Sequence, residues 1–181
     1  MIVTNDFAKK TIEEVAPLVE ETSELKTNLK NSEVIINENS FFEKDVSAYY
    51  FPRMDILHFK EKYFMTKPFF KALVGHEVMH QAQYNTFTDL IKRESELYKT
   101  NINPEESPLR KLIEGDACFI ERKIIKKYSI PFWLISSVES SSDYSLWANI
   151  LQKKFNGNRK DINELYTAPV EELVKIFGGN K

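Results

Sequence analysis

Two histidines and a glutamate in the run His76-Glu77-Val78-Met79-His80 have the types and the spacing of a catalytic zinc site. Residues four apart lie one turn apart on the same face of an α-helix, so the two imidazoles can bind one tetrahedral ion. Glu77 lies about 100° around the helix from His76 and can take a proton from a water in the open coordination position. Because the chain holds only three histidines, this pattern favours a metal site over two unrelated side chains.

The third ligand of such a site has to come from another segment, and Glu114 is the best candidate. It lies in the run LIEGDAC, residues 112–118, whose small side chains allow one helix to pack closely against another. A glycine inside a helix, such as Gly115, lowers the stability by about 0.5–1 kcal/mol relative to alanine. Its presence is therefore best explained by close packing against another helix. The competing ligands are His58 and Glu121, and Glu121 is alternatively an outer partner of a ligand. The simplest alternative for Glu114 is a solvated carboxylate on an amphipathic helix.

Together, the runs HEVMH and EGDA resemble the gluzincin group of zinc metallopeptidases, in which the glutamate of an EGxA-type helix is the third ligand. The resemblance covers about residues 33–128. It implies a zincin-like fold with zinc bound by His76, His80 and Glu114, and it implies that Glu77 is the general base.

The chain departs from the gluzincin pattern at Cys118. Members with an ExxxD helix use the aspartate four residues after the ligand to orient the first histidine, and this chain has a cysteine at that position. The orienting role is therefore left to Asp116, to Glu121 or to another segment.

The function expected from this site is zinc-dependent hydrolysis of peptide bonds in a peptide or protein substrate. Zinc activates a water and polarises the scissile carbonyl, while Glu77 accepts the proton and passes it to the leaving amine. An exposed strand edge before the motif helix could hold an extended peptide over the metal. The tetrahedral oxyanion needs a further donor, and the candidates are Tyr84, Tyr144 and Tyr166.

Two alternatives to an active peptidase follow from the same motif. The first is a zincin-like interaction module that binds zinc and catalyses nothing; a fourth protein ligand, such as His58 or Asp116, would favour it because no position would remain for water. An intact Glu77 argues against this reading, since a structural metal does not need a base. The second is a protease whose own N-terminal segment blocks the cleft.

The composition agrees with one globular domain covering residues 1–181. The chain is 42% hydrophobic, and its net charge of −2 comes from 25 basic and 27 acidic residues that are interspersed. This charge pattern predicts neither nucleic-acid nor membrane binding. A single cysteine, the lack of a signal-peptide pattern and the lack of a long apolar run predict a cytoplasmic protein.

Helices and strands that could position the site follow from periodicity and capping. Short β-branched and aromatic runs predict a strand-rich part at about 33–60, and helical periodicity predicts a helical part at about 66–177. Thr66 and Ser107, each followed by an early proline, mark the starts of the motif helix and the ligand helix. The predicted class is α+β, with a small antiparallel or mixed sheet, an active-site helix, a ligand helix and a helical C-terminal part. The expected strands are 33–36, 48–51 and 55–59, the last two as a hairpin, and the expected helices are 6–27 with a kink or break at Pro17, 66–84, 87–98, 107–128, 143–155 and 161–176.

Overall fold

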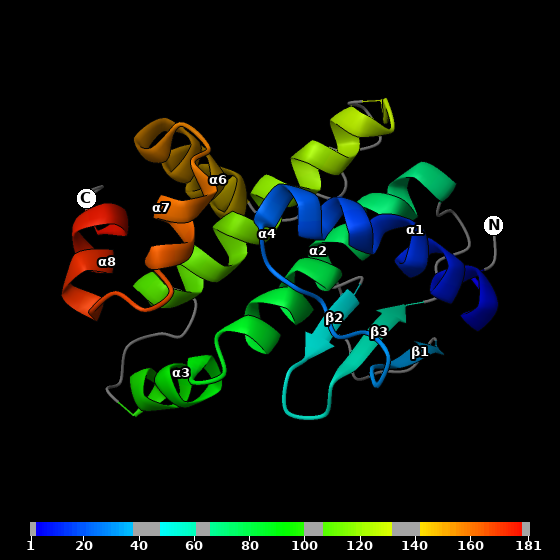
Figure 1. Cartoon of the computed structure of the whole chain (residues 1–181), viewed down its shortest axis with the longest axis horizontal. Helices are drawn as coiled ribbons and strands as arrows, with labels where there is room; N and C mark the ends of the chain where they lie inside the picture. Colours follow the sequence, from blue (N-terminus) through cyan, green and yellow to red (C-terminus); the bar gives the residue numbers. More distant parts are fainter. Residues whose placement is uncertain (1–2, 38–47, 61–65, 100–106, 132–141, 179–181) are drawn as a thin grey trace.

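The computed structural model describes residues 3–37, 48–60, 66–99, 107–131 and 142–178 (Figure 1). These residues form an α+β fold, in which helices dominate and three short strands make one mixed sheet. The predicted fold class is thus confirmed. The predicted loop at 101–106 lies outside the described residues. Within them, no helix combines the length and the apolar character needed to cross a membrane.

The sheet has the strand order β1-β3-β2. β1 (Glu33–Asn37) runs parallel to β3 (Ile56–Lys60), and β2 (Ala48–Phe51) runs antiparallel to it. The predicted hairpin of the last two strands is therefore confirmed. Its turn contains Asp55, which has a left-handed backbone with φ of 52° and accepts a hydrogen bond from the Tyr50 hydroxyl.

Both helices expected to carry the metal ligands begin where their capping residues predict. α2 (Lys67–Thr86) starts after Thr66, whose hydroxyl accepts from the Phe69 amide. α4 (Pro108–Lys127) starts after Ser107, whose hydroxyl accepts from the Arg110 amide. In each helix a first-turn proline fills a position where the amide hydrogen would have no helical partner. The three predicted ligands therefore lie on two helices of five to six turns each.

Three predicted helix boundaries are wrong. α1 (Asn5–Ser23) runs past Pro17 as one element and ends before 27, because Glu24 takes a left-handed backbone with φ of 58°. The helix predicted at 161–176 is two helices, α7 (Arg159–Glu164) and α8 (Val170–Phe177), because Pro169 cannot donate a helical hydrogen bond. The helix predicted from 87 begins later, as α3 (Leu90–Tyr98).

The core has two main parts, which meet along α4. One part joins α1, the sheet, α2 and the second half of α4, and the other joins the first half of α4 to α6 (Ser142–Phe155), α7 and α8 (Figure 1). α4 thus carries its side chains between the histidine helix on one side and the C-terminal helices on the other. Any polar group buried along α4 can contact both parts.

Two glycines lie where a neighbouring helix leaves little room for a Cβ. A Cβ built at Gly75 of α2 would lie 1.9 Å from the Ile124 side chain of α4. A Cβ built at Gly115 of α4 would lie 2.8 Å from Cβ and 3.0 Å from the carbonyl carbon of Trp147 in α6. Gly115 therefore has a packing reason, as predicted, but against α6; the close approach of α4 to the histidine helix occurs at Gly75.

Gly115→Ala is expected to destabilise the protein by about 1–2 kcal/mol, because overpacking against the α6 backbone outweighs the gain in helix propensity. Urea unfolding would measure the loss. Gly75→Ala should cost less, since its Cβ would meet side-chain atoms of Ile124 and Val15 rather than backbone atoms, and its closest contact is the end of the Ile124 side chain. A stability of Gly115→Ala equal to or above that of the wild type would contradict the packing argument.

Candidate metal centre

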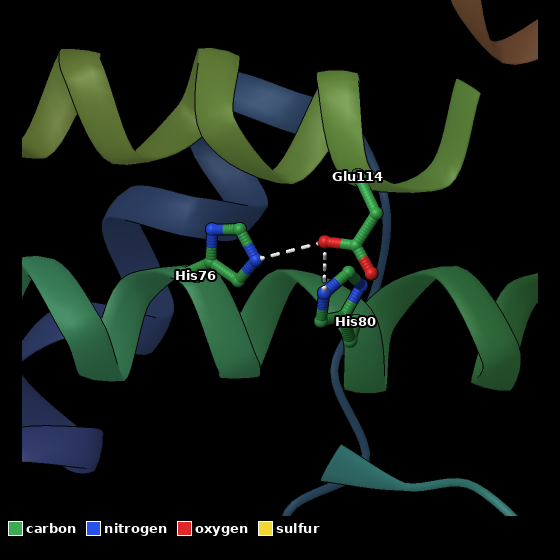
Figure 2. A group of neighbouring side chains, drawn as sticks. All are labelled: His76, His80 and Glu114. Atoms are coloured by element: carbon green, nitrogen blue, oxygen red, sulfur yellow. Dashed lines mark hydrogen bonds and ion pairs between the residues drawn. The ribbon is translucent and has the colours of Figure 1, made fainter. Parts of the chain in front are cut away.

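His76, His80 and Glu114 meet where α2 and α4 lie side by side (Figure 2). Glu114 Oε2 lies 3.3 Å from His76 Nε2 and 3.4 Å from His80 Nε2. One ligand atom from each residue lies within 4.8 Å of the other two. The vertices of a tetrahedron around zinc, with bonds of about 2.0–2.1 Å, are about 3.3–3.4 Å apart. The donor types and the two measured separations therefore fit a zinc ion.

The two helices bury the carboxylate more deeply than the imidazoles. The side-chain exposure is 3% for Glu114, 10% for His80 and 13% for His76. The two histidine rings are nearly perpendicular, with an interplanar angle of 81° and centroids 4.8 Å apart. Such a group has its anionic ligand in the interior and its nitrogen ligands toward the surface, which suits an ion that also has to be reached by a water or a substrate.

Electrostatics keep the Glu114 carboxylate charged. Burial by itself raises the pKa of Glu114, but the charges of His80 and Arg110 and the hydrogen bonds with both histidines lower this pKa well below its ordinary value. Burial lowers the pKa of His76, but its hydrogen bonds to Glu114 and Glu121, together with the charges of Glu77 and Glu121, raise this pKa well above its ordinary value. The anionic Glu114 thus faces two imidazoles, which together are a donor set suited to a divalent cation.

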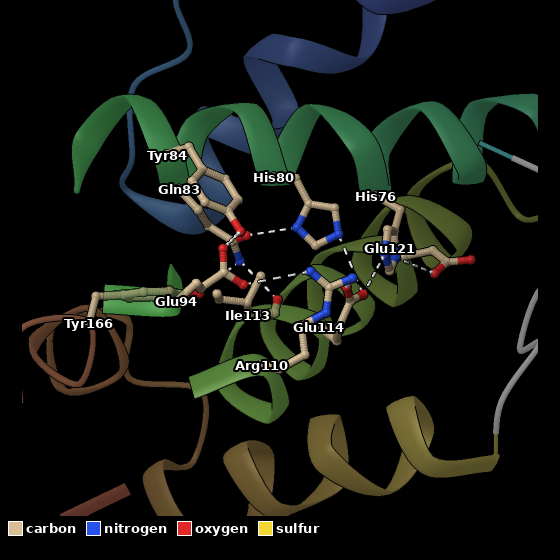
Figure 3. A network of polar contacts seen from close by, with 10 residues as sticks. All are labelled: His76, His80, Gln83, Tyr84, Glu94, Arg110, Ile113, Glu114, Glu121 and Tyr166. Carbon is tan, nitrogen blue, oxygen red and sulfur yellow. Dashed lines mark hydrogen bonds and ion pairs between the residues drawn. The ribbon is translucent and has the colours of Figure 1, made fainter. Parts of the chain in front are cut away.

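Arg110 fixes which oxygen of Glu114 faces the histidines. Its Nη2 lies 2.5 Å from Glu114 Oε1, one helical turn away, and its Nη1 lies 3.8 Å from Glu94 (Figure 3). Glu94 in turn accepts a hydrogen bond from the Tyr84 hydroxyl. Because Oε1 is bound by Arg110, Oε2 alone faces both imidazoles, which favours a carboxylate that binds through one oxygen.

Glu121 occupies the orienting position next to the first histidine. Its Oε2 lies 3.2 Å from His76 Nδ1, on the side of the ring away from Glu114 (Figure 3). Asp116, the other residue considered for this role, instead forms a buried ion pair with Arg159. The structure thus brings Glu121 to the position that Cys118 cannot fill, two helical turns after the carboxylate ligand.

Glu77 follows His76 on the same helix and is buried, with 5% of its surface exposed. Burial raises the pKa of Glu77, while the nearby charges of His76 and His80 act in the opposite direction and only partly cancel the effect. A carboxylate whose pKa is raised is a better proton acceptor for a weakly acidic water than an ordinary glutamate. The environment of Glu77 therefore suits a general base.

The remaining residues considered from the sequence lie elsewhere or have other partners. His58 lies in β3, where its Nε2 is 2.7 Å from Asn37 Oδ1, and it is not part of the ligand group. Burial lowers its pKa. The Tyr84 and Tyr166 hydroxyls donate to Glu94 and Asp116 respectively, and Tyr144 packs against Trp147. The structure gives the hydroxyl protons of Tyr84 and Tyr166 acceptors other than a substrate oxyanion.

Two polar residues of the site were not singled out from the sequence, Gln83 and Arg110. Gln83 lies three residues after His80 on α2, and its Oε1 is 2.8 Å from His80 Nδ1. Arg110 lies four residues before Glu114 on α4. Both spacings place a side chain over a metal ligand on the same helix face, so helical periodicity could have indicated both residues.

Searches against protein-family models, curated proteins and solved structures found no match for this chain. The relation to gluzincins therefore stays a prediction from the two motifs.

Proposed function

We propose that this protein is a zinc metallopeptidase that hydrolyses peptide bonds in a peptide or protein substrate. The observation that carries the proposal is the meeting of His76, His80 and Glu114, with Glu114 Oε2 at 3.3 and 3.4 Å from the two histidine nitrogens and the buried Glu77 next to His76. Zinc at such a site supplies Lewis-acid activation of a water and of a carbonyl.

Each protein group has a separate task in this proposal. His76 and His80 would hold the ion through Nε2 and Glu114 would hold it through Oε2, while Arg110 keeps the other carboxylate oxygen occupied. Glu77 accepts the proton of the attacking water on its carboxylate and later delivers it to the leaving amine. Its raised pKa supports both transfers, because a more acidic carboxylate would accept the proton less readily and would lose it to solvent before the amine leaves.

The sheet offers a place for an extended substrate. β2 pairs with β3 along one side, and the described strands leave its other side at the edge of the sheet. The ring of Tyr50 in β2 lies 6.0 Å from the ring of Tyr84 in α2, so this edge is near the helix that carries the histidines. An edge strand can bind a peptide backbone by strand addition, which supports a peptide substrate.

A zinc-binding module without activity remains the second candidate, and the ligand count bears on it. A structural zinc has four protein ligands, whereas a catalytic zinc has three and an open position. Among the residues that the structure describes, the ligand group has three members, and neither His58 nor Asp116 is one of them.

The dispersed charge and the single cysteine support a cytoplasmic protein that does not bind nucleic acid or membranes.

Hydrolysis of a quenched-fluorescence peptide library with and without a chelator would test the proposal. We expect cleavage by the wild type, loss of cleavage on chelation and recovery with added zinc. Chelation should also lower the melting temperature by roughly 5–10 °C, since a ligand at a hundred times its Kd stabilises a native state by about 2.7 kcal/mol. Cleavage that persists after complete metal removal would exclude a metal-dependent mechanism.

A further inference from the structure

A chain of buried hydrogen bonds leads from the outer nitrogen of His80 into the second part of the core. His80 Nδ1 lies 2.8 Å from Gln83 Oε1, and Gln83 Nε2 lies 2.7 Å from the Tyr166 hydroxyl (Figure 3). The Tyr166 hydroxyl lies 2.8 Å from Asp116 Oδ2. All four side chains are buried. This chain of hydrogen bonds connects α2 to α4 through Tyr166, which follows α7.

The far end of this chain is a fixed negative charge. Arg159 Nη1 lies 2.5 Å from Asp116 Oδ1, and its Nη2 lies 3.0 Å from Oδ2. The Arg159 Nε–H donates to the Ser23 carbonyl, which ties the pair to the end of α1. A guanidinium does not lose its proton in a protein, so the paired Asp116 carboxylate is ionised and can only accept hydrogen bonds.

Each hydrogen bond between Asp116 and His80 then has only one possible direction from donor to acceptor. Tyr166 has a single proton and donates it to Asp116, so its oxygen has to accept from Gln83. Burial and the Asp116 charge raise the pKa of Tyr166 well above its ordinary value, which keeps that proton in place. The Gln83 amide nitrogen also donates to the Ile113 carbonyl at 3.0 Å, which uses both of its hydrogens.

These directions determine which nitrogen of His80 carries hydrogen. With its amide nitrogen bound to Tyr166 and Ile113, Gln83 presents its carbonyl oxygen to His80. An oxygen acceptor requires a donor at His80 Nδ1, so a neutral imidazole has its hydrogen there and a lone pair on Nε2. Nε2 is the atom that faces Glu114 at 3.4 Å.

We propose that Asp116, Tyr166 and Gln83 are positioning residues that set the tautomer of His80 and so keep its Nε2 available for a metal ion. The inference rests on the proposed function, because it gives this tautomer a purpose at the same metal centre. Without the chain, the Glu114 carboxylate would favour a proton on Nε2, the nitrogen that has to bind the ion. Stacking of Tyr166 on Phe87, with centroids 4.5 Å apart, holds the hydroxyl in position.

Tyr166→Phe tests the chain without touching any metal ligand. It removes one oxygen, which is one of the two acceptors that fix the Gln83 amide, and should raise the Kd for zinc by roughly 10–100-fold, the usual effect of losing an outer partner of a ligand. Tyr50→Phe is the matched control, since that hydroxyl also donates to an aspartate, Asp55, at 2.9 Å but lies outside the chain. The control should bind zinc with the wild-type Kd, measured by competition with a chromophoric chelator.

The tautomer can be measured directly, by long-range ¹⁵N–¹H NMR of metal-free protein at a pH where His80 is neutral. We expect hydrogen on Nδ1 in the wild type and in Tyr50→Phe, and increased hydrogen on Nε2 in Tyr166→Phe. A wild-type His80 with its hydrogen on Nε2, or a Tyr166→Phe variant with unchanged tautomer and unchanged Kd, would overturn the inference.

The wild-type NMR measurement also decides the matter if Tyr166→Phe does not fold. Failure of the proposed function gives a different result. A wild type that binds no zinc would refute the metallopeptidase, while hydrogen on Nδ1 of His80 would still support the hydrogen-bond chain.

Discussion

Glu77→Gln is expected to keep zinc at the wild-type level and to hydrolyse peptides at least about a hundredfold more slowly, the usual effect of losing a positioned general base. The substitution keeps the size of the side chain and leaves His76, His80 and Glu114 unchanged. It removes the group that accepts the proton from water. The rate of hydrolysis should be measured with a library peptide that the wild type cleaves, and the zinc content should be measured on the same preparation.

The stability of Glu77→Gln serves as its internal control. Glu77 is buried, and burial raises its pKa, so replacing it by a neutral amide removes an unfavourable desolvation of charge. The melting temperature of the variant should therefore be no lower than that of the wild type. If wild type and variant cleave at the same rate, Glu77 is not the base, and if neither cleaves any peptide, the inactive zinc-binding module becomes the better account.

Glu114→Ala is expected to weaken zinc binding by roughly a hundredfold or more, because the site loses its one anionic ligand and an outer-shell change alone costs 10–100-fold. His76→Ala and His80→Ala should have effects of the same order. His58→Ala should keep the wild-type Kd, since His58 binds Asn37 in the sheet and is not in the ligand group. Isothermal titration of metal-free protein with zinc would measure the Kd of all four variants.

Glu114→Gln separates the loss of the ligand charge from any disturbance of the helix. The amide fills the same space and can still accept from Arg110, which lies 2.5 Å from Oε1. We expect weaker zinc binding than in the wild type, and also a lower stability of the protein without zinc, because the half-buried Arg110 and His76 lose their charged partner. The reverse pattern, in which Glu114→Ala keeps zinc and His58→Ala loses it, would show that the strand histidine is the third ligand.

The local parts of the site are predictable from sequence because they depend on helix geometry. One helix turn brings His76 and His80 together, and capping by Thr66 sets where that helix begins. The small residues after Glu114 indicate close packing, although only the three-dimensional structure shows that Gly115 faces α6 rather than α2. Periodicity identifies the face of a residue within its helix, but not the neighbour that this face contacts.

The partners of the ligands are harder to predict because they come from distant segments. Asp116 pairs with Arg159 and Tyr166, which follow it by more than forty positions in the chain. A sequence motif gives no reason to connect either residue with His80. Glu121 could be proposed beside His76, but only its measured separation of 3.2 Å distinguishes it from Asp116 in that role.

Elemental analysis of the wild-type protein, purified without added metal or chelator, tests the central proposal most directly. We expect about one zinc per chain, and less than a tenth of that in His80→Ala prepared in parallel, because a three-ligand site loses most of its affinity with any one ligand. A wild type without bound zinc that also fails to bind added zinc, or a His80→Ala variant with as much zinc as the wild type, would contradict the proposed metal centre.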